Sequence, residues 1–176
     1  MIIGAVNPVD MRGDLHTLRK TCLYGSKVMA VGSIFIALVL ACLLAIGALS
    51  ALTDDPSATM AEVLGDSVDD AWEYAEVLAV FLLAEFTVLT TYWVMSSISG
   101  NESPFTVENT GRITLLSKVY IVAAFILAVF EYGGSRSVAS TAFLFFGCIL
   151  LAAVLFMFGL MVRYGSVLQD QSDRTL

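Results

Sequence analysis

Residues 28–52 read VMAVGSIFIALVLACLLAIGALSAL and contain no charged side chain. At ~1.5 Å per residue, a helix of this length crosses the ~30 Å hydrocarbon layer of a membrane. A helix is required because lipid offers no hydrogen bonds to the backbone of an unpaired strand. Three further apolar blocks without proline follow at residues 77–98, 113–132 and 140–162. We therefore expect an all-α polytopic membrane protein, a four-transmembrane-helix bundle that forms a single membrane domain over residues 1–176.

The composition of the whole chain indicates that lipid is its solvent. Hydrophobic residues make up 58% of the sequence and the mean hydropathy is +0.84, whereas soluble globular domains contain roughly 45–50% apolar residues. The apolar run at residues 28–52 is too long for the ~7–15 residues of a signal-peptide core, so we interpret it as a retained helix. Cys22, Cys42 and Cys148 have no CxxC spacing, which favours packing roles over a zinc site or a disulfide framework.

The basic residues predict the orientation of the helices. If the four blocks cross the membrane, eight of the nine lysines and arginines lie on one face and only Arg136 lies on the other. The eight are Arg12, Arg19, Lys20, Lys27, Arg112, Lys118, Arg163 and Arg174. The positive-inside rule assigns this face to the cytoplasm. We therefore expect a multi-pass protein of the cell membrane with both termini in the cytoplasm.

The acidic segment between the first two blocks predicts a short external amphipathic helix. Thr59 and Glu62 have the spacing of a capping box, and apolar residues follow at helical intervals as far as Trp72. Trp72 and Tyr74 would then lie near the membrane surface, where aromatic rings are enriched. One face of this helix would carry five carboxylates, those of Asp66, Asp69, Asp70, Glu73 and Glu76. Because the segment lacks the pattern of an EF-hand loop, we interpret this face as solvated rather than as a calcium or magnesium site.

Glu85 is an ionisable residue well inside the second apolar block. Inserting its charged form into lipid costs ~3 kcal/mol or more, so such a residue is a candidate functional site. Tyr92 and several threonines add polar groups nearby, and we take Glu85 and Tyr92 as a candidate intramembrane polar site. Two interpretations stay open. Either Glu85 is protonated or hydrogen-bonded and only ties helices together, or it serves a proton- or cation-coupled function.

Small residues recur every four positions in the first block, at Ser33, Ala37, Ala41 and Ala45. Small side chains at this spacing let two helix backbones approach closely. We expect this stripe to pack, either within the bundle or between copies of the chain in a homo-oligomer.

The sequence contains no catalytic motif that we recognise. Glycine-rich phosphate loops, nucleophile elbows and HExxH patterns are absent, and the single histidine, His16, lies in a basic tail. A lone histidine without acidic or sulfur partners does not form a metal site. We therefore predict no catalytic residues, no bound metal and no cofactor, and we do not expect an enzyme.

Two segments on the expected cytoplasmic side carry a family resemblance. Residues 100–113, GNESPFTVENTGRI, and the chain end at residues 165–176, GSVLQDQSDRTL, resemble the patterns G-x-x-PF-x-x-x-N-x-x-R-I and LQ-x-x-x-D-x-T-I/L of the family called domain of unknown function 2975. The matching loop residues are Pro104, Phe105, Asn109 and Arg112. The matching tail residues are Leu168, Gln169, Asp173, Thr175 and Leu176. An insertion between Gly100 and Pro104 departs from the shortest family loops, so the register before Pro104 is open.

The resemblance implies a small prokaryotic integral membrane protein of four spans. Genes of this family look like frequent neighbours of genes for short helix-turn-helix regulators. The resemblance therefore suggests that this chain is a membrane-bound partner of a cytoplasmic DNA-binding protein and does not itself bind nucleic acid. Two alternatives are a small transporter or channel subunit that uses Glu85, and a structural or assembly factor. The loop and the tail would form either a single docking surface or a structural cap on the bundle.

Overall fold

The computed structural model describes residues 8–52, 71–100, 103, 105–135 and 137–175 of this chain. Four helices form an all-α bundle, and the described residues contain no strand. They are α1 (Pro8–Ser50), α3 (Ala71–Ser99), α4 (Val107–Ser135) and α5 (Val138–Thr175). The predicted fold class is therefore confirmed. The external helix expected around residues 59–72 lies almost wholly outside the described residues, and α3 begins at Ala71.

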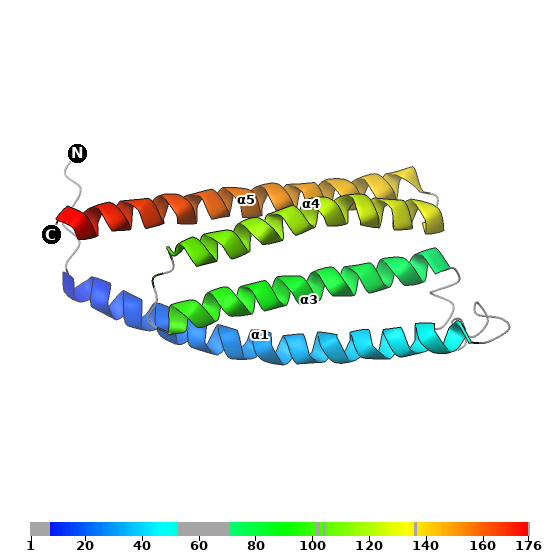
Figure 1. Cartoon of the computed structure of the whole chain (residues 1–176), viewed down its shortest axis with the longest axis horizontal. Helices are drawn as coiled ribbons and strands as arrows, with labels where there is room; N and C mark the ends of the chain where they lie inside the picture. The colour runs from blue at the N-terminus through cyan, green and yellow to red at the C-terminus, as the bar shows by residue number, and fades with distance from the viewer. Residues whose placement is uncertain (1–7, 53–70, 101–102, 104, 136, 176) are drawn as a thin grey trace.

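The four helices lie roughly along one axis, and each runs in the opposite direction to the one before it in the sequence, as Figure 1 shows. Each helix packs on its neighbours in the chain: α1 on α3, α3 on α4, and α4 on α5. The start of α1, the α3–α4 connection and the end of α5 lie at the same end of the bundle. We call this the terminal end, and the other the opposite end.

All four helices are long and apolar enough to cross a membrane. α3 and α4 have 29 residues each, or about 44 Å of helix. α1 has 43 residues and α5 has 38, so they measure about 65 and 57 Å. A hydrocarbon layer of ~30 Å therefore leaves several turns of α1 and α5 outside it. Figure 1 shows these extra turns at the terminal end.

Large apolar side chains face outward rather than into a deep core. Among the described residues, Ala124, Leu127 and Cys148 form a small buried cluster between α4 and α5. By contrast, Phe143 is 84% exposed and Phe146 is 67% exposed. Exposed apolar surface on this scale is unfavourable in water and ordinary in lipid. This distribution is that of a multi-pass membrane protein.

The start of α4 follows a simple capping rule. Thr106 precedes the helix, and its Oγ1 accepts a hydrogen bond from the backbone N–H of Asn109 at 3.1 Å. This bond satisfies one of the amide groups that the first turn of a helix leaves unpaired. Glu108 lies in the same turn, where its charge suits the helix dipole. The cap fixes where α4 begins, and therefore where Asn109 and Arg112 point.

Candidate functional site

Glu85 contacts α1 in the middle of the bundle. Ser33 Oγ donates a hydrogen bond to Glu85 Oε1 at 2.5 Å. The other carboxyl oxygen, Oε2, is buried and has no hydrogen-bond partner among the described residues. A buried oxygen without a partner costs about 1–3 kcal/mol, so this carboxyl group retains an unfilled acceptor within the membrane.

Tyr92, the second predicted residue of this polar site, lies elsewhere on α3. It is about two helical turns from Glu85, or ~10 Å, which is beyond hydrogen-bond reach. Its ring makes an edge-to-face contact with Trp93, with 5.7 Å between the ring centroids. The structure therefore does not join Glu85 and Tyr92 in one site.

The small-residue stripe of α1 is only partly buried against α3. Ser33 faces α3 through its bond to Glu85. Ala37, Ala41 and Ala45 are exposed on the described surface, so they do not pack within the bundle. The α1–α3 contact instead continues at Leu43, whose carbonyl accepts a hydrogen bond from the Tyr74 hydroxyl at 2.5 Å. Packing of the alanines between copies stays a prediction.

Asn109 and Arg112 form a polar network at the terminal end. Asn109 is fully buried, and its Nδ2 donates to Ser97 Oγ at 2.9 Å. Arg112 Nη1 donates to Asn109 Oδ1 at 3.3 Å and to the backbone carbonyl of Trp93 at 3.2 Å. Arg112 also pairs with Glu108 at 2.5 Å. These contacts support the structural interpretation of the two residues, because Asn109 has no surface with which to meet a partner.

The Arg112 guanidinium group also lies over an aromatic ring. Its Cζ is 5.6 Å from the centroid of the Trp93 ring. A guanidinium group at this distance from the indole face is in the range of a cation–π contact. The network therefore joins the last turns of α3 to the first two turns of α4 across the loop.

The α3–α4 loop and the end of α5 are in contact, as expected for two segments on one face of the membrane. Ser103 Oγ donates to Gln169 Oε1 at 2.7 Å, across 66 residues of sequence. The Phe105 ring lies against Gly165, where an added Cβ would be 2.5 Å from Phe105 Cδ1. Phe105 keeps 45% of its surface exposed, and Leu168 keeps 50%. We call Ser103, Phe105, Gly165, Leu168 and Gln169 the loop–tail surface.

Several predicted residues cannot be placed in this surface. Pro104 and Leu176 lie outside the described residues, and the side chains of Asp173 and Thr175 are not described either. The carboxylates Asp66, Asp69 and Asp70 also lie outside the described residues. In the part of the chain that the structure describes, no group of three histidine, cysteine or acidic residues is placed to hold a metal ion.

Sequence reasoning missed most of the polar partners between helices. The Ser117 hydroxyl is buried and donates to the backbone carbonyl of Ala152 in α5 at 2.9 Å. Thr87 Oγ1 and the Tyr120 hydroxyl are 3.1 Å apart between α3 and α4. The only sequence signal for such pairs is similar depth in antiparallel spans. That signal was available for Ser33 and Glu85, which lie in neighbouring spans.

These features define a class of protein: an all-α, multi-pass membrane protein whose loop and tail meet at the end of the bundle where the chain terminates. Comparison with family models, with curated proteins and with solved structures gives no match. The resemblance to the domain of unknown function 2975 family therefore stays a prediction from the residues of the loop and the tail.

Proposed function

We propose that this chain is a non-enzymatic membrane protein that holds a small cytoplasmic helix-turn-helix regulator at its terminal end. The observation that carries the proposal is the loop–tail surface, in which the loop contacts Gly165 and Gln169 while Phe105 and Leu168 stay about half exposed. The type of partner comes from the family resemblance. Deletion of the tail would remove half of this surface, so binding of the regulator should require both segments.

Charge supports a cytoplasmic location for the terminal end, with the protein in the cell membrane. Three basic residues, Arg19, Lys20 and Lys27, lie in the first half of α1, which starts at this end; Arg112 lies in the second turn of α4, and Arg163 lies in the last third of α5. Basic residues flanking apolar spans are retained on the cytoplasmic side. A cytoplasmic regulator would therefore meet the loop–tail surface directly.

The length of α5 supports a docking role for its last turns. The apolar block ends at residue 162, and Leu168 lies about 9 Å further along the helix axis. Val167 and Leu168 are 48% and 50% exposed. These neighbouring side chains extend the exposed apolar surface beyond the apolar block, and contiguous exposed apolar patches mark interaction sites.

Site-specific cross-linking in native membranes tests this function. A photoreactive amino acid at position 168 should give an adduct with a small helix-turn-helix protein, identified by mass spectrometry. The same probe at Leu23, which is 45% exposed on α1, is the matched control and should not give this adduct. Adducts at position 168 with lipid or with further copies of the chain alone would refute the proposal.

Matched substitutions measure how strongly the surface contributes. Leu168→Asp should weaken capture of the identified regulator by about fivefold or more, because a buried anchor of an interface contributes over ~1 kcal/mol. Leu23→Asp makes the same change at similar exposure and should leave capture unchanged. Equal effects of the two substitutions would indicate a general loss of the protein rather than a docking site.

A small transporter or channel subunit is a second candidate function, favoured by Glu85. Its Oε2 has no partner among the described residues, so this oxygen is available to accept a proton or a cation. In reconstituted vesicles this function predicts proton or cation flux that Glu85→Gln abolishes. Flux that is absent, or equal in the two proteins, would exclude it.

A further inference from the structure

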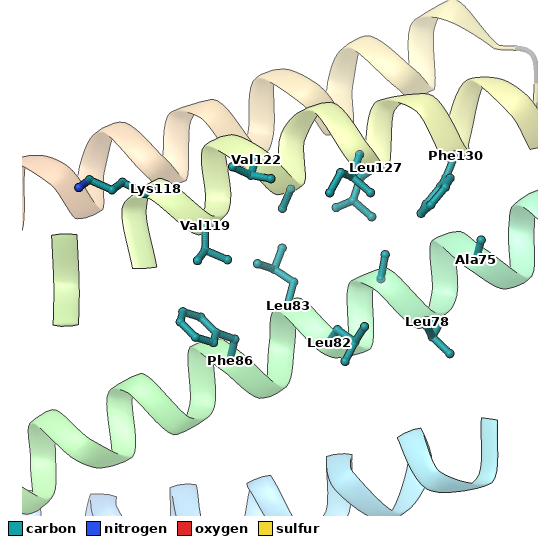
Figure 2. Close-up of a pocket in the computed structure, with 13 residues that line it drawn as sticks. Ala75, Leu78, Leu82, Leu83, Phe86, Lys118, Val119, Val122, Leu127 and Phe130 are labelled. Carbon is teal, nitrogen blue, oxygen red and sulfur yellow. The ribbon is translucent and has the colours of Figure 1, made fainter. Parts of the chain in front are cut away.

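An apolar groove runs along the bundle between α3 and α4. Its volume is about 710 Å³, within the ~300–1,000 Å³ of sites that hold small ligands. Figure 2 shows side chains of both helices facing each other across it. The lining includes Leu78, Leu82 and Phe86 of α3 and Val119, Val122 and Phe130 of α4. Leu82 and Val122 are both more than half exposed, so the groove is open on one side to the surrounding lipid.

Small side chains explain why the two helices leave this space. Ala75, Ala79 and Ala123 line the groove where larger residues would fill it. α3 and α4 also pack less extensively than α4 and α5 do. The groove therefore follows from the sequence at the α3–α4 contact.

Among the described residues that line the groove, Lys118 is the one that carries a charge. It lies on the side of the terminal end, and Figure 2 shows its nitrogen pointing away from the apolar side chains toward that end. No hydrogen bond or ion pair joins Lys118 to any residue that the structure describes. A lysine near the end of a span extends its ammonium group to the headgroup level, where it favours an anion.

We propose that this groove binds one acyl chain of an anionic phospholipid, with the headgroup phosphate on Lys118. The groove follows α4 from Lys118 to Phe130, a distance of about 18 Å. One leaflet of a ~30 Å hydrocarbon layer is ~15 Å thick, so an acyl chain that starts at Lys118 matches this length. The apolar lining excludes a free phosphate ion as the occupant, because such an ion would lose its hydration without compensation. The proposal is independent of which protein meets the loop–tail surface.

The test uses the full-length chain, delipidated in an uncharged detergent and titrated with phosphatidylglycerol or phosphatidylcholine of identical acyl chains. Native mass spectrometry counts the bound lipids. We expect tighter binding of phosphatidylglycerol. Lys118→Met should weaken this binding about fivefold, the factor for one lysine beside an anionic headgroup, and should leave phosphatidylcholine binding unchanged. Lys118→Arg should retain the preference.

Two further variants distinguish lipid binding in the groove from general attraction of anionic lipid to basic side chains. Lys27→Met removes an exposed lysine of α1, outside the groove, and should not change either affinity. Ala79→Phe fills the groove and should weaken the binding of both lipids. Equal affinities of the natural chain for the two lipids would overturn the proposal. So would an effect of Lys27→Met as large as that of Lys118→Met, or unchanged binding in Ala79→Phe.

Discussion

Asn109→Ala tests the buried network that holds the loop to the bundle. Asn109 is 0% exposed, and the substitution removes its side-chain contacts with two residues. Ser97 Oγ accepts from Asn109 Nδ2 at 2.9 Å and donates to its Oδ1 at 3.1 Å, a pair counted below as one bond, and Arg112 donates to Oδ1 at 3.3 Å. A neutral hydrogen bond contributes about 1 kcal/mol and one to a charged group about 1.5 kcal/mol or more. The free energy of unfolding should therefore fall by about 2.5 kcal/mol. Arg112 keeps its contacts with Glu108 and with the Trp93 carbonyl, so no further loss is expected.

Unfolding in mixed micelles with rising SDS, followed by circular dichroism, measures this change. Glu108→Ala is the matched control. It removes a different partner of Arg112, a carboxylate side chain that is 67% exposed. An exposed ion pair contributes at most about 1 kcal/mol, so the control should cost less than half as much. A double-mutant cycle of Asn109→Ala with Ser97→Ala should give a coupling energy near 1 kcal/mol. Equal losses for Asn109→Ala and Glu108→Ala, or no coupling, would refute the reasoning.

Three more predictions follow from single contacts. Gly165→Ala should displace the Phe105 ring, since its Cβ would be 2.5 Å from that ring, and should speed hydrogen exchange of the Phe105 amide; unchanged exchange would contradict the contact. Ser33→Ala should lower the free energy of unfolding by about 1–3 kcal/mol, because it leaves both oxygens of Glu85 unpaired. Glu85→Gln keeps an acceptor for Ser33 and should lower it less. SDS titration compares the two variants, and a larger loss for Glu85→Gln would refute this reasoning. Ser117→Ala removes a buried bond to an α5 carbonyl and should cost about 1 kcal/mol by the same assay; a loss below 0.3 kcal/mol would exclude a net contribution.

The fold was predictable because lipid imposes strict conditions on the chain. An uncharged block such as residues 28–52 has one structural solution in a membrane, and the helix α1 contains nearly all of it. The helix ends were not predictable from hydropathy. α1 begins well before its apolar block and α5 continues beyond residue 162, because polar residues outside lipid are equally compatible with a helix.

The candidate site was predictable in its location and not in its contacts. Placing the α3–α4 loop and the chain end on one face of the membrane predicts that Phe105 and Gln169 are near each other. The bond from Ser103 to Gln169 and the burial of Asn109 depend on the axial position of each helix relative to its neighbour. Helix tilt and axial position are set by packing, which periodicity does not reveal.

The looser contact between α3 and α4 divides the bundle into two helical hairpins, α1–α3 and α4–α5. In the first hairpin Ser33 bonds to Glu85, and in the second Ser117 bonds to Ala152. Each hairpin therefore contains an intramembrane polar bond of its own, whereas the contact between Thr87 and Tyr120 requires both hairpins. We therefore expect the α1–α3 hairpin to keep its bond between Ser33 and Glu85 in the absence of α4 and α5.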